Sequence, residues 1–229
     1  MTDHVHDLRS VREATDRLLT AVAKLDNAAL AEESHLPGWT RGHILAHLAR
    51  NADALVNVLE GRPMYASAEA RDRDIERDSS RPLEVQLADL RETSERFLAQ
   101  EGADQDWSRT VELRNGVTDL ASNVPFRRLV EVELHHVDLN IGYELEDLPD
   151  EFTGREIEFL ADRWAGRPEV PPTALVAADG RGWRTGSAGD PAVTVSGTAA
   201  GLLAWLAGRA DKGASLTTAG GPLPALPPL

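Results

Sequence analysis

The sequence predicts a mainly α protein in which a helical bundle precedes a small α+β domain. Apolar side chains recur with helical spacing from the N-terminus to about residue 165. The character then changes at Pro168, where RPEVPP (167–172) is typical of a linker and short β-like runs separated by Gly and Asp follow. We therefore expect two domains, 1–167 and 168–229, a division that a chain of 229 residues allows.

The first predicted helix lies within 4–33, where the apolar positions suit an amphipathic helix that Pro37 and Gly38 end. Thr40 is a plausible N-cap for a second helix that continues to Gly61. Residues 62–80 are rich in Arg, Asp, Glu and Ser. This composition predicts a loop with room for a short helix.

A third helix is predicted from Pro82 to Gly102, because proline is favoured in a first helical turn and glycine after the last. Asn115-Gly116 predicts the turn of a short hairpin. A helix then begins near Pro125 and runs to a polar segment that ends in Pro149, and a fifth helix covers 151–166. In the small domain, TALVAAD, RGWRTG and AVTVSG predict strands, and TAAGLLAWLAGR predicts one helix before a Gly/Pro-rich tail.

Composition excludes several classes of function. The formal net charge of −14 repels phosphate backbones, so we expect no nucleic-acid partner. The absence of cysteine excludes disulfides, thiolate zinc fingers and a cysteine nucleophile. No apolar run approaches the ~18 residues of a membrane span, and the N-terminus lacks the pattern of a secretory signal. We expect a cytoplasmic protein with no membrane partner.

The stretch EVELHHVDLN (131–140) concentrates ionisable residues in an otherwise apolar segment. Glu131 and His135 are four residues apart and share a helix face, with Asp138 near it; His43 and His47 form a second such pair. Two histidines and one carboxylate form a known catalytic zinc set that leaves a fourth position open. Facing helices of bundles commonly build metal sites in this way.

Spacing alone does not establish a metal site, because HExxH is absent and isolated motif matches are often false. The commoner situation is a solvated Glu131 beside a hydrogen-bonded core histidine at 135. His43 fits a ligand, a group behind the ligands, or a surface histidine at a helix start. We interpret His136 as structural or exposed.

The stretch LPGWTRGHILAHLARNADAL (36–55) resembles the mycothiol-dependent maleylpyruvate isomerase family, a branch of the DinB-like helical-bundle metalloproteins. PMYASAEARDRDI (63–75), EVELHHVDL (131–139) and VTVSGTAAGLLAWLAGRADKG (193–213) resemble further blocks of that family, in the same order. The resemblance implies a DinB-like four-helix bundle followed by a small α+β C-terminal domain. It also implies a small anionic substrate, and we expect the chain to be a monomer.

The family's zinc ligands fall on His47, Glu131 and His135, so the resemblance implies Zn²⁺ or another divalent metal there, with mycothiol as the thiol cofactor. Two arginines that the family associates with activity fall on Arg71 and Arg209. Such cations suit a dianionic substrate. The alternatives are a solvated charge at Arg71 and a cation favoured by the helix dipole at Arg209.

The implied reaction is the cis–trans isomerisation of maleylpyruvate to fumarylpyruvate in the gentisate pathway, by thiolate addition, bond rotation and elimination. An alternative is a mycothiol S-transferase that adds the thiol to another small electrophile. A more distant alternative is a binding module with a vestigial metal site, against which the intact metal triad argues. The arginines favour an acidic substrate and hence the isomerase.

Overall fold

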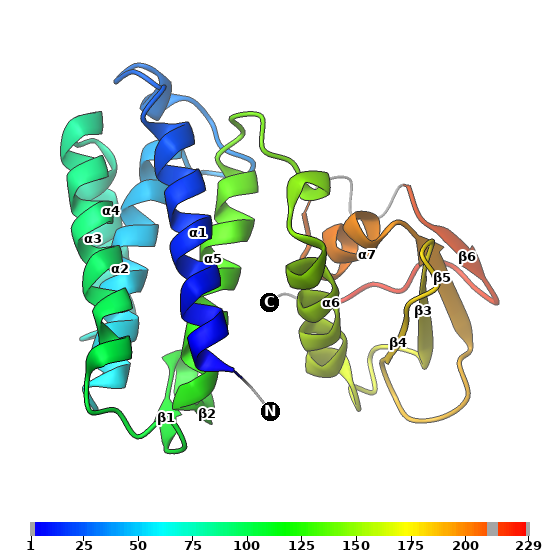
Figure 1. The fold of residues 1–229 in the computed structure, drawn as a ribbon. Coiled ribbons are helices and arrows are strands. Elements are labelled where there is room, and N and C mark those ends of the chain that lie inside the picture. Colours follow the sequence, from blue (N-terminus) through cyan, green and yellow to red (C-terminus); the bar gives the residue numbers. More distant parts are fainter. Residues whose placement is uncertain (1–2, 210–214, 228–229) are drawn as a thin grey trace. The chain divides into compact units, whose positions relative to one another are not determined.

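The computed structural model describes residues 3–209 and 215–227, and the chain divides into two compact units, Met1–Tyr143 and Glu144–Leu229 (Figure 1). This division comes earlier than the expected one between residues 167 and 168. The reason is the helix Asp150–Trp164 (α6), which the sequence analysis assigned to the bundle. It packs against the second unit's own helix and sheet.

The first unit is the expected helical bundle. Its four long helices are α1 (His4–Val22), α2 (Arg41–Leu59), α4 (Leu83–Leu98) and α5 (Val124–Asp138). Helix α1 packs against α5, and α2 packs against both α4 and α5 (Figure 1). Helix α1 ends earlier than the expected 4–33 and is followed by a single 3-10 turn at Ala29–Ala31. No helix in the described part of the chain combines the length and the apolar character needed to cross a membrane.

The bundle core is built from apolar residues that recur at helical spacing. Burying each large side chain contributes about 1.5–3 kcal/mol. The helices owe their stability mainly to this packing, because isolated helices of such length are marginal in water. Core positions include Leu8, Val11, Leu18 and Val22 of α1, Ile44, Leu48 and Leu55 of α2, Leu90 and Phe97 of α4, and Leu129 and Val132 of α5.

A fifth helix of the first unit, α3 (Ala68–Ser79), lies where the sequence analysis expected a loop with room for a short helix. Ser67 begins it by accepting a hydrogen bond from Ala70 N at 3.1 Å. Ile75 is its only buried large apolar residue. Without an apolar stripe the helix has no periodic signal in the sequence, and it is held to α2 largely by polar contacts.

The expected hairpin is present as β1 (Thr110–Glu112) and β2 (Thr118–Leu120), which pair antiparallel. Asn115 and Gly116 adopt φ angles of 61° and 72°. Asparagine and glycine tolerate this left-handed region better than other residues, so the confirmed turn follows from the Asn-Gly pair.

The second unit has one four-stranded sheet in the order β4-β3-β5-β6, in which β3 and β5 are parallel and the other neighbours antiparallel. The three predicted strands and the predicted helix are confirmed, and β6 is an addition. Its elements are α6 (Asp150–Trp164), β3 (Thr173–Ala177), β4 (Gly182–Thr185), β5 (Val193–Gly197), α7 (Ala199–Leu206) and β6 (Thr217–Ala219).

Close approach of α3 to α2 depends on Gly42 in the first turn of α2. A Cβ atom at this position would lie 2.1 Å from the backbone oxygen of Ser79 at the end of α3. That separation is far inside van der Waals contact, and a backbone oxygen cannot rotate away. The glycine therefore lets the C-terminus of α3 rest directly on α2.

We predict that Gly42→Ala destabilises the protein by about 1–3 kcal/mol, the usual cost of overpacking, although alanine favours a helix by ~1 kcal/mol over glycine. The measurement is the free energy of unfolding in urea. Gly102→Ala is the matched control, because a Cβ there meets nothing within 4 Å. Equal stability of the two variants would show that α3 does not rest on α2 at Gly42.

Candidate metal centre

Three side chains from two helices converge inside the bundle: His47 from α2, and Glu131 and His135 from α5. Their ligand atoms all lie within 4.8 Å of one another. Glu131 Oε2 is 2.9 Å from His47 Nε2 and 3.2 Å from His135 Nε2. The two imidazole rings are perpendicular, with centroids 4.7 Å apart.

The register of α2 and α5 is set by two arginines that sequence reasoning did not identify. Arg128 is fully buried, and its Nη1 donates to Leu48 O and to Asn51 Oδ1, both at 2.8 Å. At the other end, Arg41 Nε donates at 2.9 Å to the carbonyl oxygen of Leu139, which ends α5. These bonds fix which turn of α2 lies opposite Glu131 and His135.

Burial lowers the pKa of Arg128 to about 10, which leaves the guanidinium charged at neutral pH. Arg128 is three residues before Glu131, so this cation lies on the same side of α5 as the carboxylate. The negative charge of Glu131 acts on this cation through space and favours its charged form.

The three side chains hold different protonation states. Burial alone would raise the pKa of Glu131, but hydrogen bonds from His135 and His47 hold it well below its ordinary value. Burial works against protonation of His135, yet hydrogen bonds to Asp138 and Glu131 raise its pKa. For His47 burial dominates and lowers the pKa to about 4. The centre therefore favours a charged Glu131 and a neutral His47, and it keeps His135 protonated to higher pH than a free imidazole.

Each imidazole has a second partner at Nδ1. His135 Nδ1 is 2.8 Å from Oδ2 of the fully buried Asp138, which holds a proton on Nδ1 and aims Nε2 at the centre. His47 Nδ1 is 3.2 Å from Arg71 Nη2. An arginine only donates, so His47 Nδ1 accepts here and the ring proton lies on Nε2, toward Glu131. The sequence analysis placed Asp138 near this face without giving it a role.

Arg71 reaches the centre from α3, and its side chain is 13% exposed. Its Cζ lies 5.9 Å from the centre of the Tyr65 ring, and burial raises the pKa of that phenol. The Trp39 ring centroid lies 5.4 Å from that of His47. Tyr65 and Trp39 were not identified as site residues, although both lie in the stretches that resemble the family.

The remaining histidines of the predicted motifs lie outside this cluster. His43 Nδ1 accepts from Thr40 N at 3.2 Å in a capping box, and its Nε2 lies 3.2 Å from Glu76 Oε2 of α3. It therefore caps the first turn of α2 and connects that helix to α3. His136 is buried and stacks on Tyr143, with ring centroids 4.0 Å apart.

Arg209 belongs to the second unit, directly after α7. Its Nη1 donates to Ala207 O at 2.9 Å. Arg209 therefore lies just past the C-terminal end of α7, within the second unit. The structure thus brings His47, Glu131, His135 and Arg71 together within the first unit.

The donor set suits a divalent metal. It offers two imidazole nitrogens and one carboxylate oxygen, the combination found in catalytic zinc sites with an open fourth position. The hydrogen bond that His135 Nδ1 donates to Asp138 is of the kind that orients metal-binding imidazoles. A neutral histidine bound through Nε2 carries its proton on Nδ1. A metal at His47 Nε2 therefore removes the acceptor that Arg71 uses.

Comparisons with known proteins agree with this geometry. Residues 11–140 match the family model "Mycothiol maleylpyruvate isomerase N-terminal domain", and residues 147–228 match "MDMPI C-terminal domain". A crystal structure of a mycothiol-dependent maleylpyruvate isomerase is 28% identical in sequence, with a TM-score of 0.88 over 99% of this chain and 97% of that one.

A variant of that enzyme with one histidine replaced by alanine is similar to this chain, with a TM-score of 0.87 at 28% identity and the same coverage. A search of curated proteins found no match. The two family models together span most of the chain, and the gap between them contains the boundary between Tyr143 and Glu144. The chain belongs to the mycothiol maleylpyruvate isomerase family.

Proposed function

We propose that this protein uses mycothiol and a bound divalent metal to convert maleylpyruvate to fumarylpyruvate. The observation that carries the proposal is the convergence of His47, Glu131 and His135 on one point, in a chain that aligns over nearly its whole length with an enzyme of that name. A geometric cluster alone fits many functions. The cluster and the match to the isomerase structure together favour the isomerisation of maleylpyruvate.

His47, Glu131 and His135 are the residues that would hold the metal, and we propose zinc because this donor set recurs in catalytic zinc sites. When bound, the metal would favour the thiolate form of a thiol whose pKa is otherwise ~8.5. The chain has no cysteine of its own, so the sulfur has to come from mycothiol. A cytoplasmic monomer without a nucleic-acid partner remains our expectation.

The proposed isomerisation regenerates the thiol and needs no further reactant. The thiolate adds to one carbon of the cis double bond, and the electron pair moves through the conjugated system to the carbonyl oxygen, which becomes an enolate. The former double bond is then single and rotates. Return of the electron pair restores the double bond in the trans geometry and expels the thiolate.

Arg71 and Arg209 are proposed to bind the anionic groups of the substrate. Arg71 is well placed for this role because a metal at His47 Nε2 displaces its present acceptor. Its Nη2 then becomes available to donate to a substrate carboxylate or to the enolate oxygen, while Nη1 keeps its hydrogen bond of 2.8 Å to Asp72 Oδ1. For Arg209 the support is the family resemblance of its stretch of sequence.

His47→Ala, Glu131→Gln and His135→Ala should each lower the zinc content from about one ion per chain to a small fraction, because a site with three protein ligands does not tolerate the loss of one. Elemental analysis of the purified proteins measures this. The matched control is His43→Ala, which lies one turn away on the same helix and should keep its zinc. Full zinc content in His47→Ala, or equal loss in His43→Ala, would require a different ligand set.

Zinc binding near pH 6.5 should release about half a proton or more per chain, because the raised pKa favours the protonated form of His135 while Glu131 is deprotonated and His47 is neutral. The affinity for zinc should rise with pH until it passes the pKa of His135, and then level off. Calorimetric titration of the metal-free protein in buffers with different ionisation enthalpies counts the protons. Binding with no proton released near pH 6.5 would contradict this protonation state.

Arg71→Lys and Arg209→Lys should both retain zinc and lose activity, since lysine lacks the planar fork that binds a carboxylate through two hydrogen bonds. By analogy with truncated charge pairs, the loss is about 2–5 kcal/mol, or about thirtyfold or more in rate. The assay follows maleylpyruvate with mycothiol present. Arg73→Lys, an exposed position on the same helix as Arg71, is the control. Unchanged activity in Arg71→Ala or Arg209→Ala would remove that residue from the mechanism.

A further inference from the structure

We propose that Asp78 is a positioning residue that acts through helix α3 to hold Arg71 beside the metal centre. The inference rests on the proposed role of Arg71 in binding the substrate. Asp78 lies in the last turn of α3, outside the cluster of His47, Glu131 and His135, and its side chain is 1% exposed. A carboxylate so deeply buried needs nearby cations, and the arrangement of those cations carries the inference.

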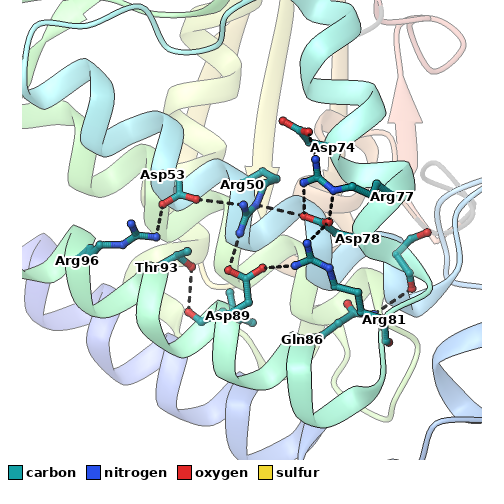
Figure 2. A network of polar contacts seen from close by, with 12 residues as sticks. Arg50, Asp53, Asp74, Arg77, Asp78, Arg81, Gln86, Asp89, Thr93 and Arg96 are labelled. Atoms are coloured by element: carbon teal, nitrogen blue, oxygen red, sulfur yellow. Dashed lines mark hydrogen bonds and ion pairs between the residues drawn. The ribbon is translucent and has the colours of Figure 1, made fainter.

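Asp78 is one corner of a closed ring of alternating charges, shown in Figure 2. Arg50 of α2 lies 3.8 Å from Asp78 and also pairs with Asp89 of α4. Arg81, just after α3, pairs with Asp78 and lies 3.2 Å from Asp89. The ring Arg50–Asp78–Arg81–Asp89 therefore joins three helices. Arg77 adds a further hydrogen bond of 2.7 Å to Asp78.

The ring holds the same face of α3 that carries Arg71. Asp78 is seven residues after Arg71, two helical turns along one side, and the buried Ile75 lies between them. Helix α3 runs antiparallel to α2, because Ser79 contacts Gly42, Glu76 pairs with His43, and Arg71 contacts His47. Fixing the C-terminal end of α3 therefore fixes where its N-terminal half meets His47.

Ion pairs hold α3 against α2 because α3 has almost no apolar surface to bury. Only Ile75 packs in the manner of a core residue. Removing the charge of Asp78 leaves Arg50, Arg77 and Arg81 around a neutral group, and like charges then push α3 away from α2. A displacement of about 1 Å at Arg71 is enough to lower a rate by up to ~100-fold.

The test compares Asp78→Asn with Asp74→Asn. Asp74 also pairs with Arg77 on α3, but it is 43% exposed and lies outside the ring. Asp78→Asn should keep its zinc and lower kcat/KM by about 10- to 100-fold, whereas Asp74→Asn stays within about twofold of the parent. Amide hydrogen exchange of residues 68–79 should become faster in Asp78→Asn alone. This second measurement does not depend on activity.

A double-mutant cycle with Arg71→Ala then decides whether Asp78 acts through Arg71. We expect the double variant to be no slower than Arg71→Ala, within about twofold, because the positioning residue has nothing left to position. Multiplicative losses would overturn the proposal, as would unchanged activity or unchanged exchange in Asp78→Asn.

If Asp78→Asn does not fold, Asp89→Asn opens the same ring from α4 and should show the same lack of additivity with Arg71→Ala; multiplicative losses there would overturn the proposal equally. Full activity in Arg71→Ala alone would refute the proposed role of Arg71 and this inference with it. Loss of activity in Arg71→Ala, with Asp78→Asn and Asp74→Asn behaving alike, would refute only the role of Asp78.

Discussion

The guanidinium of Arg128 is buried between α5 and α2, where it donates to Leu48 O and Asn51 Oδ1. A charged group in this position is costly unless it is hydrogen-bonded, so the two helices are held where those acceptors lie. His47 is adjacent to Leu48, and Glu131 follows Arg128 by one turn. The meeting of His47 with Glu131 and His135 depends on this register. A slip of one residue along either helix would turn the ligands away from one another.

Two parts of the first unit are held by different physical means. The proposed metal ligands lie on α2 and α5, whose contact is a packed apolar core with buried hydrogen bonds. Arg71 stands on α3, which is attached to the bundle by ion pairs around Asp78 and by the close contact at Gly42. Ligands for a metal require fixed geometry. The proposed role of Arg71, in which it exchanges His47 for a substrate carboxylate, requires a side chain that can turn while its helix stays in place.

Features with a regular repeat were predictable from the sequence. The four-residue spacing from Glu131 to His135 and the phase of His47 indicated a shared face, and family resemblance supplied the rest of the hypothesis. Helix α3 was not predicted as a full helix, because its stability comes from charges on neighbouring helices and not from an apolar stripe. The structural role of Arg128 was not predictable for a similar reason, since its acceptors lie about 80 residues away in sequence. The expected domain boundary lies later than the one at Tyr143, because α6 has an ordinary amphipathic pattern that does not reveal which unit it packs against.

The central claim is that His47, Glu131 and His135 hold a metal with one position left for the thiol of mycothiol. X-ray absorption at the zinc edge, recorded on the zinc-loaded protein before and after mycothiol is added, tests this most directly. The chain contains no cysteine, so a thiolate sulfur bound to zinc has to come from the added thiol. Nitrogen and oxygen neighbours at about 2.0–2.2 Å, joined on addition of mycothiol by one sulfur at ~2.3 Å, is the predicted result. A zinc environment that mycothiol leaves unchanged would contradict the account.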